Sequence, residues 1–126
     1  MPTTYTFEGG ILTVRTGREP GYGEVISTTK RALDELHISA GALVILDASE
    51  LRAGRSPEAL RDLAGRLQDE RLGAVALVAV TEHHYGMARV FQVHAEEHVA
   101  IQVFRNLEKA RDWLHLMGGP SVQAKA

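Results

Sequence analysis

Apolar residues follow two patterns along the chain, and the two patterns alternate. Continuous apolar runs at Ala42–Leu46 and Ala74–Val80 are typical of strands that are covered on both faces of a sheet. Apolar positions three and four residues apart, as over Glu24–His37, predict amphipathic helices. Strands that alternate with helices over short connections favour a parallel sheet with right-handed crossovers.

The N-terminal residues predict a β-hairpin. Threonine alternates with aromatic residues over Thr3–Phe7, which predicts a strand. Gly9 and Gly10 tolerate positive φ angles, and Ile11–Arg15 then returns as a second strand. The first strand of this hairpin would add an antiparallel edge to the sheet.

A second helix is predicted to begin at Ser56. This serine is a suitable N-cap, and Pro57 and Glu58 follow it at positions where helices favour a proline and an acid. Gly73 is placed to end the helix.

The C-terminal part of the chain predicts a helix, a strand and a helix in succession. These elements cover His83–Glu97, Val99–Phe104 and Leu107–Met117. Asn106 stands immediately before the last helix and can cap it.

Together the elements predict an α/β domain. Its sheet is mixed and mostly parallel, with about five strands, an N-terminal hairpin and four flanking helices. One domain over residues 1–120 accounts for all of them. Residues 121–126 are small and polar and are expected to form a flexible tail.

The composition narrows the functional classes. The 126 residues have a net charge of −2 that is spread along the chain, so no basic surface for nucleic acid is expected. The absence of cysteine excludes disulfides and thiol catalysis and fits the cytoplasm. The opening MPTTYTFEGG lacks the features of a secretion signal, and no apolar run approaches the roughly 20 residues of a membrane span. We therefore expect a cytoplasmic protein without a transmembrane segment.

The carboxyl ends of the strands are the expected place for a site, because ligands of open α/β sheets bind there. Those ends lead into Arg15–Tyr22, Asp47–Ser56, Thr81–Tyr85 and Arg105–Asn106. The loop GREPGYGEVIS has the context of a dinucleotide-binding fingerprint, but Ile26 occupies its third glycine position. No cofactor is therefore predicted.

Two pairs of histidines suggest catalysis or metal binding. In each case the sequence lacks one further residue that the site would need. His83 and His84 are placed to act as a general base at the start of the third helix, but spacing identifies no nucleophile. His94 and His98 form an H-x-x-E-H pattern, the inverted zincin motif, yet no acid downstream is placed to be the third ligand. No metal site is predicted.

The stretch YGMAR, from Tyr85 to Arg89, is the most informative one. Gly86 and Ala88 lower the helix propensity, which indicates that the backbone approaches something closely: the sheet, a ligand or a second subunit. Arg89 lies one turn beyond Tyr85, where it can pair with an acid such as Asp47 or with an anionic ligand.

The run YGMARVFQ, followed by VFRNLEKARDWL, resembles the small bacterial SpoIIAA-like group, which is also labelled STAS/Sec14-like. The early hairpin and the strand end Ile45-Leu46-Asp47 fit as well, and the tail pattern is made by Phe104, Ala110, Trp113 and Leu114. The resemblance covers nearly the whole chain and implies a mixed, mostly parallel sheet flanked by helices. It also implies protein–protein regulation or the binding of small apolar or lipid-like ligands, with no catalytic activity established for the group.

One segment departs from the regulators of this fold. Anti-sigma-factor antagonists carry a D-S-S-G-type phosphorylation segment after the strand that corresponds to Ala42–Asp47. Arg55-Ser56-Pro57-Glu58 stands in about that place, without the aspartate and the glycine. Since Ser56 also serves as a helix cap, it is a doubtful phosphorylation site.

The leading hypothesis is a non-enzymatic binding or regulatory module. It would hold a small apolar or anionic, lipid-like ligand, or a protein partner, at the carboxyl ends of its strands. In the ligand version Tyr85 makes a hydrogen bond, Arg89 holds an anionic head, and Met87 and Phe91 line an apolar wall. The candidate ligand-binding residues are Asp47, His83, His84, Tyr85, Met87, Arg89 and Phe91.

Two alternatives stay open. The first is a homodimeric protein-interaction domain without a ligand, whose third helix packs across a two-fold axis at Gly86 and Ala88. The second and weaker one is a hydrolase or transferase that uses His83 or His84.

Overall fold

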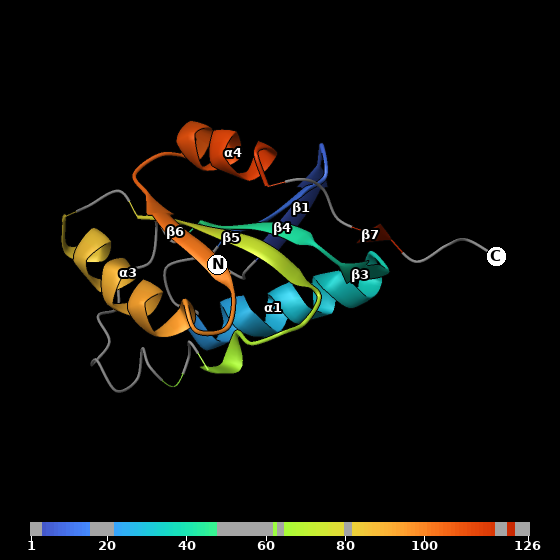
Figure 1. Ribbon diagram of the computed structural model, residues 1–126, viewed down its shortest axis with the longest axis horizontal. Helices are drawn as coiled ribbons and strands as arrows, with labels where there is room; N and C mark the ends of the chain where they lie inside the picture. Colours follow the sequence, from blue (N-terminus) through green and yellow to red (C-terminus); the bar gives the residue numbers. More distant parts are fainter. Residues whose placement is uncertain are drawn as a thin grey trace.

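The computed structural model describes residues 4–15, 22–47, 62, 65–79, 82–117 and 121–122. Within these ranges the chain forms a five-stranded sheet with helices on both faces, and a separate two-stranded sheet (Figure 1). The α/β class that the alternating pattern predicts is confirmed.

The five-stranded sheet has the strand order β1-β2-β4-β5-β6. Its strands are β1 (Thr4–Glu8), β2 (Ile11–Arg15), β4 (Ala42–Asp47), β5 (Leu72–Val78) and β6 (Ala100–Phe104). β1 pairs antiparallel with β2, and the remaining pairs are parallel. The predicted hairpin with its antiparallel edge strand is therefore confirmed, and β6 forms the opposite edge.

Helices cover both faces of this sheet. α1 (Tyr22–Glu35) and α3 (Glu82–Ala95) pack on one face, and α4 (Leu107–His115) packs on the other (Figure 1). Three of the four predicted helices therefore have described bounds. The helix predicted from Ser56 lies mostly outside the described residues, although residues 65–66 are helical.

Each face of the sheet has its own core, because successive side chains of a strand point to opposite faces. On the face of α1 and α3, the strand residues Leu12, Val44 and Val75 are buried completely. Leu33 of α1 and Phe91 of α3 cover them and are themselves 0% and 1% exposed. This is the larger of the two cores.

The core under α4 contains smaller side chains. Ala74 and Ala76 of β5 allow α4 to lie close to the sheet, and Ala110 and Leu114 of the helix are completely buried there. Trp113 of α4 packs beside this core against Phe104 of β6. Its ring centroid lies 5.7 Å from that of Phe104. The A-x-x-W-L tail is thus a packing motif of α4.

Gly73 lies inside β5, so the prediction that it ends the second helix is wrong. A Cβ atom built on Gly73 would lie 2.8 Å from the backbone of Gly41. Gly41 has a φ of 69°, a left-handed conformation that favours glycine. The two glycines therefore meet where β4 and β5 begin, and this close approach of two backbones requires glycine at residue 73.

The hydrophobic pattern does not predict the second sheet. In it, β3 (Ile38–Ala40) pairs antiparallel with β7 (Ser121–Val122). His37, with a φ of 57°, turns the chain from α1 into β3. Ser121 and Val122 belong to the segment expected to be a flexible tail, and here they are paired to a strand.

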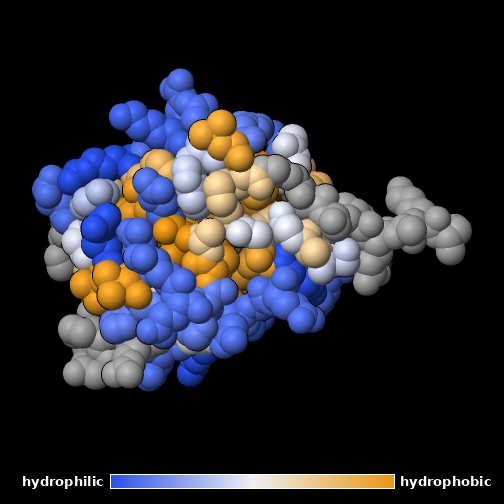
Figure 2. All heavy atoms as spheres, viewed as in Figure 1, coloured by the Kyte–Doolittle hydropathy of each residue, from blue (hydrophilic) through white to orange (hydrophobic). Residues whose placement is uncertain are grey.

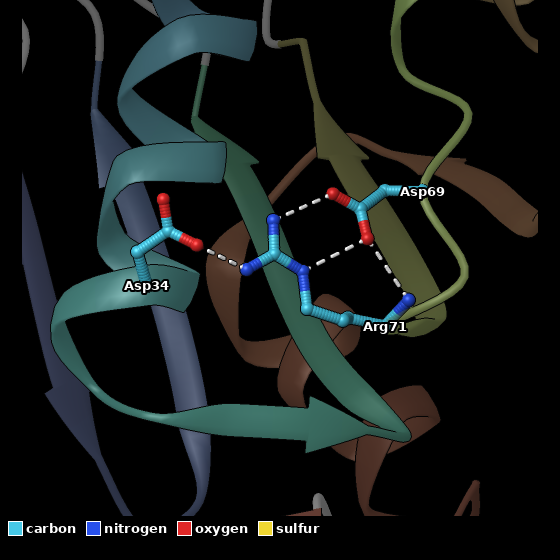
Figure 3. A network of polar contacts seen from close by, with 3 residues as sticks. All are labelled: Asp34, Asp69 and Arg71. Atoms are coloured by element: carbon cyan, nitrogen blue, oxygen red, sulfur yellow. Dashed lines mark hydrogen bonds and ion pairs between the residues drawn. The ribbon is translucent and has the colours of Figure 1, made fainter.

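Arg71 links α1 to the segment that leads into β5 (Figure 3). Its guanidinium donates through Nη2 to Asp69 Oδ2 at 2.8 Å and through Nη1 to Asp34. The hydrogen bonds from Arg71 to Asp69 lower the pKa of the Asp69 carboxyl. The carboxylates of Asp69 and Asp34 raise the pKa of Arg71. Since the Arg71 carbonyl also accepts from the N–H of Ala42 at 2.8 Å, the network holds the starts of β4 and β5 together.

Candidate functional site

A half-buried ion pair lies at the carboxyl ends of β2 and β4. The parallel register sets Arg15 beside Asp47, and Arg15 Nε donates to Asp47 Oδ2 at 3.1 Å. The Asp47 side chain is 4% exposed and that of Arg15 is 56% exposed. A cation at the surface therefore balances a carboxylate that is buried on the α4 face of the sheet.

Arg89 has no contact with this pair. Asp47 shares its face of the sheet with Ile45, under α4, whereas α3 packs on the opposite face. Arg89 is exposed and has no ion pair among the described residues. The prediction that Arg89 pairs with Asp47 is therefore wrong. The other expected partner of Arg89, an anionic ligand, stays a prediction.

A second polar group joins the start of α3 to the end of β6. The Arg105 guanidinium carbon lies 4.2 Å from the centroid of the Tyr85 ring, and Arg105 Nη1 lies 3.0 Å from Glu82 Oε1. Tyr85 is half-buried and packs against the core, while the side chains of Arg105 and Glu82 are 47% and 86% exposed. We call these three residues the Tyr85–Arg105 corner.

The parallel order of β5 and β6 creates this corner. α3 follows the carboxyl end of β5, and β6 runs parallel to β5. The start of α3 and the end of β6 therefore lie at the same end of the sheet, where the parallel strands have their carboxyl ends. The sequence places Arg105 in the turn after the last strand. The Phe104–Asn106 turn belongs to the region where a site is expected, but no local signal indicates the contact between Arg105 and Tyr85. Arg105 is therefore absent from the individually predicted ligand-binding residues.

The remaining predicted site residues of α3 have different surroundings. Phe91 is 1% exposed among core side chains, and Met87 is partly buried against the same core. Phe91 therefore anchors α3 to the sheet, and its role in a ligand wall stays a prediction. His83 and His84 lie in the first turn of α3, but their side chains fall outside the described part of the chain, as does Ser56.

Gly86 and Ala88 differ in what surrounds them. Ala88 is 1% exposed and packs in the core under α3. Gly86 is exposed, and a Cβ atom built on it would meet nothing within 4 Å. Close approach to the sheet therefore explains the small residue at 88 and does not explain the glycine at 86.

The two histidines of the H-x-x-E-H pattern line a shared hollow of about 670 Å³, together with Glu97 and with residues 62 and 65. α3 ends at Ala95, before His98, so the two histidines do not lie one turn apart on a single helix. In the ranges that the structure describes, no three metal-binding side chains are close enough to hold an ion.

A polar hollow of about 330 Å³ lies between the hairpin and α4. It is lined mainly by Thr6, Glu8, Thr13, Arg111 and His115. Neither of these two hollows has Tyr85, Met87 or Arg89 in its lining. The Tyr85–Arg105 corner presents its charged groups at the surface.

No protein-family model and no curated protein matches the chain. A similar solved structure is that of an uncharacterized protein from the DUF3478 family with a SpoIIAA-like fold, from Shewanella loihica PV-4. The two share 18% sequence identity with a TM-score of 0.57, over 89% of this chain and 91% of that chain. The fold is SpoIIAA-like. This confirms the fold that the sequence resemblance implies.

The similarity to a SpoIIAA-like structure at this low identity concerns the fold alone. It assigns no ligand-binding or partner-binding residue to this chain. No helix among the described residues is long and apolar enough to cross a membrane.

Proposed function

We propose that the protein is a non-enzymatic binding module that holds an anionic group at the Tyr85–Arg105 corner. The observation that carries this proposal is the position of Arg105. Its side chain is 47% exposed, and its guanidinium carbon lies 4.2 Å from the centroid of the Tyr85 ring. A stacked guanidinium keeps the N–H donors along its edge, where they suit the paired oxygens of a carboxylate or phosphate.

Glu82 occupies part of that edge. Its carboxylate lies 3.0 Å from Arg105 Nη1, and its side chain is 86% exposed. Exposed ion pairs contribute about 0–1 kcal/mol, so a ligand anion can replace Glu82 at small cost. Glu82 then holds the guanidinium in position when no anion is bound, and competes with the anion when one arrives.

The expected ligand carries its anionic group on an apolar body. Tyr85 is half-buried, and its ring offers apolar surface next to the cation. A charged head on the guanidinium with an apolar body against the Tyr85 ring is the arrangement that a fatty acid would adopt. This supports the small apolar and anionic ligand that the sequence suggests.

Titration with dodecanoate and, separately, with inorganic phosphate tests the proposal. We expect dodecanoate to shift the NMR signals of Tyr85 and of the Arg105 side chain. Arg105→Gln should weaken binding at least tenfold, and Glu82→Gln should strengthen it, because the competing carboxylate is gone. Phosphate should bind more weakly than dodecanoate, since it has no apolar body.

Lys109→Gln is the matched control. It removes one exposed positive charge from α4 and leaves the corner intact, so it should bind dodecanoate as the unchanged protein does. Equal dodecanoate affinity in Arg105→Gln and Lys109→Gln would contradict the proposed site.

A further inference from the structure

The two edges of the five-stranded sheet differ in composition. β1, at one edge, has the sequence TYTFE; it ends in the charged Glu8, and its Tyr5 hydroxyl donates to Glu35 of α1. β6, at the other edge, has the sequence AIQVF, without a charge or a proline. Native edge strands are commonly protected by charges, prolines or bulges, because an open edge offers unpaired N–H and C=O groups. β6 contains none of these within its five residues.

The free edge of β6 consists of backbone groups of Ile101 and Val103. The Phe104 carbonyl accepts a hydrogen bond from the β5 side at 2.9 Å, and by alternation Gln102 faces β5 as well. Ile101 and Val103 therefore direct their N–H and C=O groups away from the sheet. Gln92 contacts one of them through Nε2, 3.3 Å from the Ile101 carbonyl, while its own Oε1 is buried without a partner.

β6 is complementary to itself when two copies run antiparallel. With Gln102 at the centre, Ile101 stands opposite Val103 of the second copy, and each such pair can exchange two N–H···O bonds. Ala100 stands opposite Phe104, so a small side chain meets a large one. The two Gln102 side chains meet on the axis, where uncharged amides are compatible with each other.

The neighbouring flank of α3 is complementary in charge. Gln92 contacts Ile101 and so identifies the flank of the helix that faces the free edge. Arg89 lies on the same flank toward the start of α3, and Glu96 lies on it just beyond the end. Both are exposed, and neither has an ion pair among the described residues. A two-fold axis at β6 would make the two helices antiparallel, which brings the Arg89 half of each toward the Glu96 end of the other.

In the described part of the chain, the surface around β6 is open and apolar. Figure 2 shows hydrophobic side chains gathered between α3 and α4, over the place where Figure 1 draws β6. α4 contacts mainly β5, away from the edge, so Ala100 and Gln102 of β6 are exposed on that face. A second strand can therefore approach β6 without displacing α4.

We propose that the free edge of β6 is the interface of a homodimer, in which two five-stranded sheets join antiparallel across an axis at Gln102. The occupant is a second copy because both the strand and the helix flank are complementary to themselves. This surface goes beyond the anion-binding corner. The β6 edge is also a different surface from the one expected for a dimer at Gly86. Gly86 shares a flank of α3 with Val93, seven residues further along, and Val93 lines the hollow beside residues 62 and 65.

Charge at residue 102 provides a specific test, because only a two-fold axis places this residue opposite itself. We expect the unchanged protein to dimerise in sedimentation equilibrium between low micromolar and several hundred micromolar concentration. Gln102→Glu and Gln102→Lys should each weaken self-association by about tenfold or more, since like charges then face each other. Mixing the two variants should restore the dimer as a heterodimer, which native mass spectrometry identifies by mass.

Thr6→Glu and Thr6→Lys are the matched controls. Thr6 is exposed on β1 at the opposite edge of the same sheet, so both variants should dimerise as the unchanged protein does. A protein that stays monomeric at all concentrations overturns the proposal. So does a dimer that both Gln102 variants retain, or a mixture of these variants that forms no heterodimer.

Discussion

Arg105 and Tyr85 are in contact although a helix and a strand separate them in the chain, with the guanidinium carbon 4.2 Å from the ring centroid. We predict a coupling energy of about 0.5–1 kcal/mol for the pair, the value of an exposed cation–π contact. Tyr85→Leu, Arg105→Gln and the double variant, compared by urea unfolding, measure it. The same cycle with Glu82→Gln in place of Tyr85→Leu separates the ring contact from the ion pair. A coupling energy of zero with Tyr85 would show that the stacking contributes nothing to stability.

Gly73→Ala is expected to destabilise the fold by about 1–3 kcal/mol, the usual cost of forcing extra atoms into a packed site. The added Cβ atom would lie 2.8 Å from the Gly41 backbone, which has no flexible side chain to move aside. Gly86→Ala is the control: its Cβ would meet nothing within 4 Å, so the better helix propensity of alanine should stabilise α3 by about 0.5–1 kcal/mol. Thermal unfolding measures both, and equal stabilities would contradict the close approach at Gly73.

The Asp69 carboxyl is expected to make part of the stability dependent on acid pH. Its pKa is lowered in the folded protein because Arg71 donates hydrogen bonds to it. A group with a lowered folded pKa stabilises the protein above its unfolded pKa, here about 3.9, and loses that contribution as pH falls through the folded pKa. Asp69→Asn should therefore be less stable at neutral pH, and its deficit should shrink in acid below about pH 4.

Urea unfolding at a series of pH values measures this difference. Arg71→Met is the matched background, because it removes the guanidinium, the strongest of the groups that lower the Asp69 pKa. In that background Asp69→Asn should change the slope of stability against pH in the acid range much less, because only the backbone N–H of residue 71 still donates to Asp69. Parallel profiles of the unchanged protein and Asp69→Asn would argue against the pairing.

Asn106 is expected to stabilise α4 as its N-cap. Its Oδ1 accepts from the N–H of Lys109 at 2.9 Å, and its backbone is extended, with φ −146° and ψ 159°. Asn106→Ala should cost about 0.5–2 kcal/mol, whereas Asn106→Asp keeps an acceptor oxygen and should cost little. Circular dichroism during thermal unfolding measures both variants. Equal losses for alanine and aspartate would show that the cap contributes nothing.

The sequence predicts well the elements whose signals are local. β2 has the predicted bounds, β4 begins at the predicted Ala42, and α4 begins at Leu107 after its Asn106 cap. Strand alternation, an apolar run and a cap each act over a few neighbouring residues, so they can be recognised without the rest of the chain.

Gly73 and β3 show where local signals are insufficient. Gly73 follows a helical pattern and precedes an apolar run, so its sequence context suits a helix end. Its glycine is required by the backbone of Gly41, more than thirty residues earlier in the chain. β3 likewise has a distant partner, β7, near the C-terminus. β3 is only three residues long, too short to show a hydrophobic pattern of its own.

The sequence by itself determined the α/β class, the strands of the five-stranded sheet and the three helices with described bounds. Only the tertiary structure decided which of the polar residues at the strand ends meet: Asp47 pairs with Arg15 under α4, and Tyr85 contacts Arg105 beside α3. The physical reason is that each contact joins residues that are distant in the chain. The order and parallel register of the strands bring them together, and the helix that covers each face decides what surrounds them.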